Sequence, residues 1–116
     1  MVLGREAQVE LFLDVVRELA RQKRVRLVRR DETMAFLNSH NILLDDVVDV
    51  LLGLQTSDRF DGPEPDRDER YRDRWTVAEF APLTDYGRLY LKLSIVNTHT
   101  LGKVLSLKLY REKECP

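Results

Sequence analysis

The stretch Arg88–Val96, RLYLKLSIV, alternates strictly between apolar and polar side chains. Successive side chains of a strand point to opposite faces of its sheet, so this alternation predicts a strand with one leucine-rich face. Residues 103–111 repeat the pattern, and residues 97–102 have the composition of a turn. We therefore expect the two strands to pair as a hairpin.

This pairing would merge the polar faces of the two strands into one surface. The side chains that it brings together are Arg88, Tyr90, Lys92, Lys108 and Tyr110. The leucines expected on the apolar face of the second strand are Leu105, Leu107 and Leu109. The polar faces of these two strands contain no carboxylate. Cations bind phosphates and tyrosine rings stack on unpaired bases, so this face favours nucleic-acid binding. The alternative is an ordinary solvent-exposed strand face, which often carries lysine.

The N-terminal half has the period of helices instead. Apolar residues fall on one helical stripe in residues 5–22 and again in residues 44–51, and Asp31 can cap a short helix between them. Residues 25–28 could form a short strand, and residues 75–81 are expected to form another. Helices followed by strands predict an α+β fold, with N-terminal helices packed on one face of a C-terminal antiparallel sheet.

We expect one domain over residues 1–116, because chains of this length rarely divide. Residues 55–73 contain two prolines, many charged side chains and few apolar ones, so we expect a mobile loop there. Such a loop is either a tolerated surface insertion or a flap over the functional site.

The composition excludes several classes of protein. With 43% hydrophobic and 34% charged residues, the chain is too apolar to be disordered, and no apolar run is long enough to span a bilayer. Cys115 is the one cysteine and can form no internal disulfide, and no secretory signal is recognisable, so we expect a cytoplasmic protein. His40 and His99 have no neighbours with metal-ligand spacing and are expected in caps or loops.

The net charge of −1 conceals a segregation along the chain. Residues 17–30 carry a net charge of +6, residues 31–73 carry −8, and residues 88–116 carry +4. Two basic stretches that flank an acidic middle indicate a polyanion-binding surface, although solvated helix faces give similar patterns.

The order of these features resembles the MqsR family of toxins, which are mRNA endonucleases with a RelE-like fold. The residues that carry the resemblance are VRLVRR at 25–30, VVDVLLGL at 47–54, SDRF at 57–60, Trp75, EFAP at 79–82, LYLKLSI at 89–95 and SLK at 106–108. The resemblance covers about residues 8–112. It lies in the combination of these elements, since no single one is diagnostic.

The resemblance implies catalytic roles for Tyr90 and Lys108, the two residues that strand alternation also places on one face. The family has a lysine where this chain has Asp61, and a glutamine where it has Thr76. Arg59, Arg74 or Glu79 could replace those side chains. Glu79 could also act as a general base, provided that its strand turns it toward the polar face.

Together, these observations predict a toxin that cleaves mRNA by 2′-OH attack, needs no metal or cofactor, and is neutralised by a cognate antitoxin. The expected RNA-binding residues are Arg74, Arg88, Lys92, Tyr110 and Arg111. The alternative is a non-catalytic RNA-binding or protein-interaction module that uses the same basic face.

Overall fold

Three helices pack against a mixed six-stranded sheet in the computed structural model, which describes residues 4–111. The helices are α1 (Arg5–Arg21), α2 (Asp31–Ser39) and α3 (Leu44–Leu52), with a 3-10 turn at Thr56–Asp58. The strands are β1 (Val25–Leu27), β2 (Arg59–Pro65), β3 (Trp75–Phe80), β4 (Leu83–Thr84), β5 (Gly87–Val96) and β6 (Gly102–Leu109). This arrangement confirms the α+β class.

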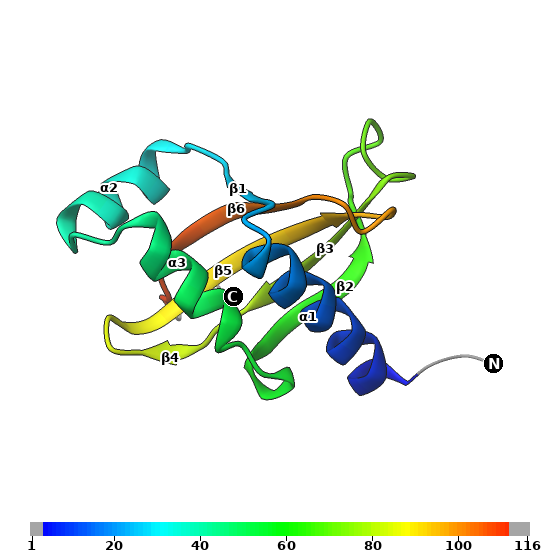
Figure 1. Ribbon diagram of the computed structural model, residues 1–116, viewed down its shortest axis with the longest axis horizontal. Helices are drawn as coiled ribbons and strands as arrows, with labels where there is room; N and C mark the ends of the chain where they lie inside the picture. Colours follow the sequence, from blue (N-terminus) through cyan, green and yellow to red (C-terminus); the bar gives the residue numbers. More distant parts are fainter. Residues whose placement is uncertain (1–3, 112–116) are drawn as a thin grey trace.

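The helices lie on one side of the sheet. In Figure 1, α1 and α3 lie across one face of the sheet and α2 lies beside one end of β6. Their apolar stripes supply Phe12, Leu13 and Leu51 to a core that also contains Phe80 and Leu91, all nearly inaccessible to solvent. The opposite face of the sheet has no helix over it among residues 4–111 (Figure 1).

The strand order is β1-β6-β5-β3-β2, with β4 paired to β5 outside this path. Neighbouring strands are antiparallel except β1, which runs parallel to β6. The expectation of a wholly antiparallel sheet was therefore wrong. A parallel pair requires a long connection rather than a tight turn, and here most of the chain lies between β1 and β6.

The expected loop at residues 55–73 was also wrong over much of its length. Residues Arg59–Pro65 form β2, which pairs with β3 at the edge of the sheet, and the connection is confined to residues 66–74. An edge strand faces solvent, so it needs no alternation of apolar residues, and it tolerates proline and register shifts. Proline and charge had been interpreted as signs of a loop.

The alternation of β5 was correct, because its four expected core residues, Leu89, Leu91, Leu93 and Ile95, are all buried. The alternation expected for β6 was wrong at one position. A register shift beside Lys92 and Leu93 places Val104 in the core and leaves Leu105 half-buried. The shift also turns Lys103 to the same face as Lys92.

Gly62 in β2 is expected to tolerate no side chain. Its φ is +80°, and a Cβ atom there would lie 2.6 Å from the carbonyl oxygen of Val77 and 2.9 Å from the Cα of Ala78. Gly62→Ala should lower the free energy of unfolding by about 1–3 kcal/mol, measured by chemical denaturation. Gly53→Ala is the matched control, because its nearest contacts are ordinary ones at 3.5 Å or more. Equal stability of the two variants would contradict this expectation.

Candidate nucleic-acid interface

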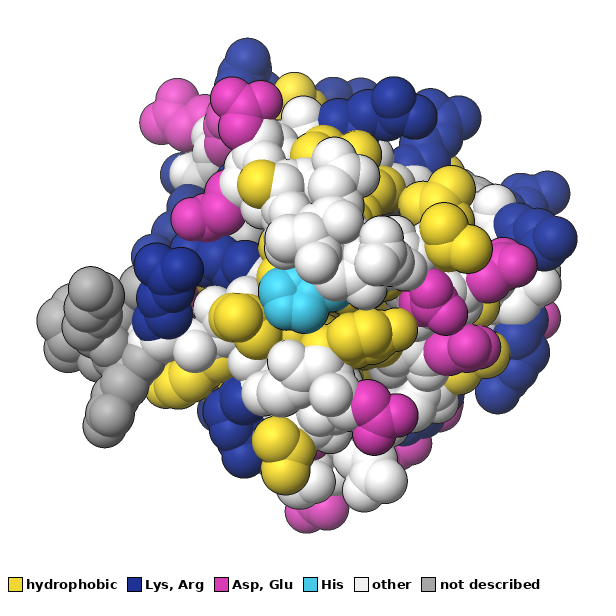
Figure 2. Space-filling model, turned by 90° about the vertical axis from the view of Figure 1, so that its left-hand side faces the viewer, with side chains coloured by type: hydrophobic (Ala, Val, Ile, Leu, Met, Phe, Trp, Pro, Cys, Tyr) yellow, Lys and Arg dark blue, Asp and Glu magenta, His cyan; other side chains and the backbone are white. Residues whose placement is uncertain are grey.

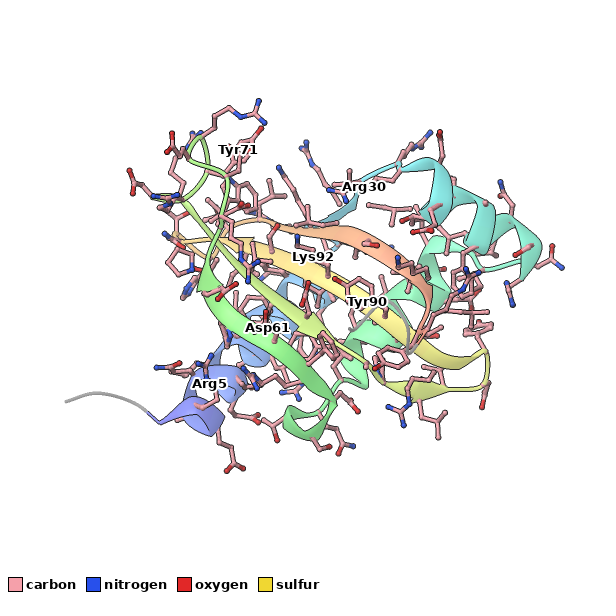
Figure 3. All side chains as sticks on the ribbon, turned by 180° about the vertical axis from the view of Figure 1, so that it is seen from behind. Arg5, Arg30, Asp61, Tyr71, Tyr90 and Lys92 are labelled. Atoms are coloured by element: carbon pink, nitrogen blue, oxygen red, sulfur yellow. The ribbon has the colours of Figure 1, made fainter. Side chains whose placement is uncertain are left out.

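The face of the sheet that points away from α1 and α3, called here the outer face, carries the polar side chains of three strands. Its residues are Trp75, Val77 and Glu79 in β3, Arg88, Tyr90, Lys92 and Ser94 in β5, and Lys103, Ser106 and Lys108 in β6. Figure 3 views this face and shows Tyr90 and Lys92 on it. The expected merging of polar strand faces is therefore found.

Tyr90 and Lys108 lie directly opposite each other on β5 and β6. The Nζ atom of Lys108 lies 5.5 Å from the centroid of the Tyr90 ring, and 3.1 Å from Oε1 of Glu32 at the start of α2. The Lys108 side chain is 23% exposed. The two residues selected from the sequence are thus adjacent, and Lys108 also forms an ion pair with Glu32.

Glu79 lies on the outer face and accepts a hydrogen bond from Tyr90. The distance from Tyr90 Oη to Glu79 Oε1 is 2.6 Å, and Glu79 lies directly opposite Lys92. Directly opposite residues have Cβ atoms about 4.5–5.5 Å apart. The structure therefore brings a carboxylate, a phenol and two lysines together. The carboxylate comes from β3, whose phase the sequence left open, while the polar faces of β5 and β6 themselves carry none.

Aromatic rings adjoin this group. Phe60 on β2 is 39% exposed and meets Tyr90 and Tyr110 edge-on, with ring centroids 6.3 Å and 6.1 Å apart. Exposed rings of this kind can stack on unpaired bases. Phe60 was not expected in the site, because its segment had been interpreted as a loop rather than a strand.

Asp61 also neighbours the site, since it lies opposite Glu79. Its carboxylate lies 3.9 Å from the guanidinium of Arg59 and 3.8 Å from that of Arg67, and it accepts a hydrogen bond from the backbone N–H of Gly62. These partners offset its charge. Asp61, Glu79 and Lys92 contribute to the lining of a small cavity of about 80 Å³.

Arg88 and Tyr110 lie at the Tyr90 end of the outer face, and Arg111 follows Tyr110 directly. The Arg88 guanidinium donates to the carbonyl oxygen of Ala81 at 2.7 Å, and the backbone N–H of Tyr110 donates to the carbonyl oxygen of Arg88 at 2.8 Å. Arg88 and Arg111 are both exposed. Both cations are thus accessible beside Tyr90.

Arg74 does not lie with the other expected RNA-binding residues. Its carbonyl oxygen accepts a hydrogen bond from the backbone N–H of Asn97, which follows β5. Tyr90 precedes Asn97 by seven residues, which is about 23 Å along a strand. Thr76 lies near the same end and donates its hydroxyl to Asn97 Oδ1 at 2.8 Å. Neither residue can act together with Tyr90 and Lys108.

A second group of aromatic and basic side chains lies at the Arg74 end of the outer face. The Nζ atom of Lys103 lies 4.2 Å from the centroid of the Trp75 ring and 5.7 Å from that of Tyr71. The Arg70 guanidinium is 5.2 Å from the Tyr71 ring. Hydrogen bonds from the side chain and backbone N–H of Arg70 lower the pKa of Asp68 to about 2. Asp68 is therefore ionised, and it holds Arg70 in the turn.

The α2 end of the molecule has a different surface. Figure 2 shows apolar side chains around a histidine in the middle of this end, with charged side chains around them. Leu43 and Leu44, which begin α3, are 70% and 64% exposed. Exposed apolar surface fits a protein partner better than a polyanion, so the outer face is the better candidate for a nucleic-acid interface.

Neither a metal-binding cluster nor a membrane-spanning helix is found among residues 4–111. No group of three or more His, Cys, Asp or Glu side chains among residues 4–111 could hold a metal ion. His40 follows α2 at its C-terminal end and His99 lies in the turn between β5 and β6, as expected. No helix within these residues is long and apolar enough to cross a bilayer. Cys115 lies outside the described residues.

Comparison with protein-family models found no match, and comparison with curated proteins found none either. The resemblance to the MqsR toxins therefore depends on the quoted segments alone, and the function must be argued from the chemistry of the outer face.

Proposed function

We propose that this protein is an endoribonuclease toxin that cuts single-stranded mRNA by attack of a ribose 2′-OH on the adjacent phosphate, without a metal ion. The observation that carries the proposal is the contact between Glu79 and Tyr90, with Lys92 opposite Glu79 and Lys108 opposite Tyr90. These four side chains supply a base, an acid and two cations, which are the groups that the reaction needs.

Glu79 is the group best placed to act as the general base. One carboxylate oxygen accepts the Tyr90 hydroxyl, which leaves the other to accept the proton of the 2′-OH. The 2′-oxygen then bonds to phosphorus, and the bond from phosphorus to the 5′-oxygen breaks. The products are a 2′,3′-cyclic phosphate and a free 5′-OH.

Tyr90 can protonate the departing 5′-oxygen. The Glu79 carboxyl group, which carries the proton from the 2′-OH on its other oxygen, then turns to return that proton to Tyr90, its hydrogen-bond partner, and both groups are restored for the next cycle. In this scheme Tyr90 both orients the carboxylate and donates a proton. No proton need come from solvent in the bond-breaking step.

The lysines stabilise the charge that develops on the phosphate. Lys92 lies opposite Glu79 and Lys108 lies opposite Tyr90, both on the β6 side of the Glu79–Tyr90 contact, and Arg88 is accessible nearby. Cations positioned before the reaction make a large contribution to catalysis of this type. Phe60 and Tyr110 would hold the flanking bases by stacking.

The resemblance to MqsR toxins extends this proposal to a RelE-like arrangement of the fold, to action in the cytoplasm on mRNA, and to neutralisation by a cognate antitoxin. Exposed apolar residues such as Leu43 and Leu44 offer a surface for such a protein partner that leaves the outer face available to RNA.

The direct test is cleavage of an unstructured RNA oligonucleotide by the purified protein in the presence of EDTA. We expect fragments that end in a 2′,3′-cyclic phosphate and begin with a 5′-OH. The same oligonucleotide with 2′-O-methyl groups should bind and stay intact, because the nucleophile is blocked. Binding of RNA without cleavage would replace the nuclease by an RNA-binding module, and absence of both would favour a protein-interaction module.

A further inference from the structure

The basic residues that follow α1 form a run of cations without acidic partners among the described residues, a property they share with Arg5, Arg72, Arg74, Arg88 and Lys92. Among residues 4–111, no carboxylate lies within ion-pair distance of the following six side chains: Lys23, Arg24, Arg26, Arg29, Arg30 and Lys103. By contrast, Arg17 and Arg21 in α1 and Arg67 near β2 each form an ion pair. The cations around β1 thus keep an uncompensated positive charge.

Four of these six residues line the edge of the sheet beside the outer face. β1 runs parallel to β6 with Arg26 directly opposite Lys103, so both side chains lie on the outer face. The backbone N–H of Val28 continues the pairing by donating to the carbonyl oxygen of Val104. Arg29 and Arg30, both exposed, then lead into α2. We call Arg26, Arg29, Arg30 and Lys103 the edge strip.

The edge strip connects the two groups of aromatic residues on the outer face. At one end, Lys103 lies over the rings of Trp75 and Tyr71. At the other end, Arg30 directly precedes α2, whose Glu32 contacts Lys108. Figure 3 shows Tyr71 and Arg30 along one side of the outer face, with Lys92 and Tyr90 nearer its centre. These cations thus follow one another along the side of the outer face that runs from Trp75 toward α2.

The length of this border suits a short nucleic-acid strand. Lys103 and Lys108 are five residues apart on β6, which corresponds to about 16 Å. A strand stacked at about 3.4 Å per nucleotide covers that distance with about five nucleotides, and an extended strand covers it with fewer.

We propose that the edge strip binds the backbone phosphates of the same RNA strand that is cut at Tyr90 and Lys108, and that a base a few nucleotides away stacks on Tyr71 or Trp75. This inference rests on the proposed ribonuclease function and adds a remote subsite to it. Cations that lack acidic partners fit phosphates, and a half-buried ring beside a lysine fits a base. An acidic protein would satisfy the charges but would not use the rings.

The test compares two double variants with wild type. Arg26→Gln/Arg30→Gln removes two charges from the edge strip, and Arg5→Gln/Arg21→Gln removes two exposed charges from α1, on the other side of the sheet (Figure 1). Binding is measured by fluorescence anisotropy with uncleavable 2′-O-methyl RNA of three and of eight nucleotides, at several salt concentrations. Thermal denaturation checks that both variants are folded.

We expect the edge-strip variant to bind the eight-nucleotide RNA about tenfold more weakly. The slope of its log affinity against log salt concentration should be shallower by about two. Its binding of the three-nucleotide 2′-O-methyl RNA, and its cleavage of unmodified RNA of the same length, should change much less, because a strand of about 10 Å bound at Lys108 does not extend to Arg26 opposite Lys103. The α1 variant should resemble wild type with both RNAs.

Equal affinity of the two double variants for the eight-nucleotide RNA would overturn the edge-strip subsite while leaving the cleavage site intact. Absence of RNA cleavage by the wild-type protein would instead overturn the proposed function. Tyr71→Ala distinguishes RNA from an acidic protein as the ligand of this subsite. Loss of the ring should weaken RNA binding but leave the binding of polyglutamate unchanged. Unchanged RNA binding by Tyr71→Ala would contradict the stacking of a base on that ring.

Discussion

Glu79→Gln should slow RNA cleavage by about 10²–10⁴-fold, because it removes the general base of the proposed reaction. Glutamine keeps the size of the side chain and can still accept the hydrogen bond that Tyr90 donates at 2.6 Å. The geometry of the outer face should therefore survive, while the proton of the 2′-OH loses its acceptor. Single-turnover cleavage rates and the affinity for 2′-O-methyl RNA, measured side by side, would separate chemistry from binding.

Glu64→Gln is the matched control for this variant. Glu64 lies on β2 opposite Val77, pairs with Arg67 and lines the same small cavity as Glu79, whereas the hydrogen bond from Tyr90 goes to Glu79. It should leave the rate unchanged. Tyr90→Phe should also reduce cleavage, since it removes both the proton donor and the hydrogen bond to Glu79. If Glu79→Gln cleaved RNA as fast as Glu64→Gln, Glu79 would not be the base.

The role of Glu79 could not be decided from the sequence, because β3 is apolar on both of its faces. Val77 and Trp75 lie on the outer face with Glu79, and Ala78 and Phe80 lie in the core. Apolar residues would have been buried whichever face of β3 turned toward the core. Only the pairing with β5 determines that Glu79 turns toward Tyr90 and Lys92.

The placement of Tyr90 was predictable because β5, unlike β3, has only one leucine-rich face. β5 lies between β6 and β3, so its leucines face a core that admits no polar side chain, and only one phase satisfies the alternation. The alternation of β6 was predicted wrongly at one position because Val104 and Leu105 are both apolar. A register shift places Val104, rather than Leu105, in the core. Lys103 was missed on the outer face for this reason.

The edge strip was visible in the sequence only as charge. Residues 17–30 have a net charge of +6, but a short strand does not reveal which distant strand it joins. The parallel pairing of β1 with β6, which occurs near the other end of the chain, brings Arg26 to Lys103. Such long-range contacts depend on the packing of the whole fold rather than on any local pattern.

Lys108→Ala should lower the cleavage rate by about 10²–10³-fold, the loss that is typical when one group that stabilises transition-state charge is removed. Lys108 lies opposite Tyr90 with its Nζ atom 5.5 Å from the centre of the ring, so it can reach a phosphate bound there. Lys108→Arg keeps the charge and should recover part of the rate. Single-turnover cleavage of the same RNA by the three proteins measures both effects.

The ion pair between Lys108 and Glu32 provides a control, because a catalytic role and a purely structural role of Lys108 predict different results for Glu32→Gln. Lys108 Nζ lies 3.1 Å from Glu32 Oε1, and Glu32 is 64% exposed, so the pair contributes little to stability. If Lys108 acts on the phosphate, Glu32 competes with RNA for it, and Glu32→Gln should bind RNA at least as tightly as wild type and cleave it at least as fast. If Lys108 serves only to anchor α2, Glu32→Gln should be as defective as Lys108→Ala. Matching losses in the two variants would remove Lys108 from the catalytic site.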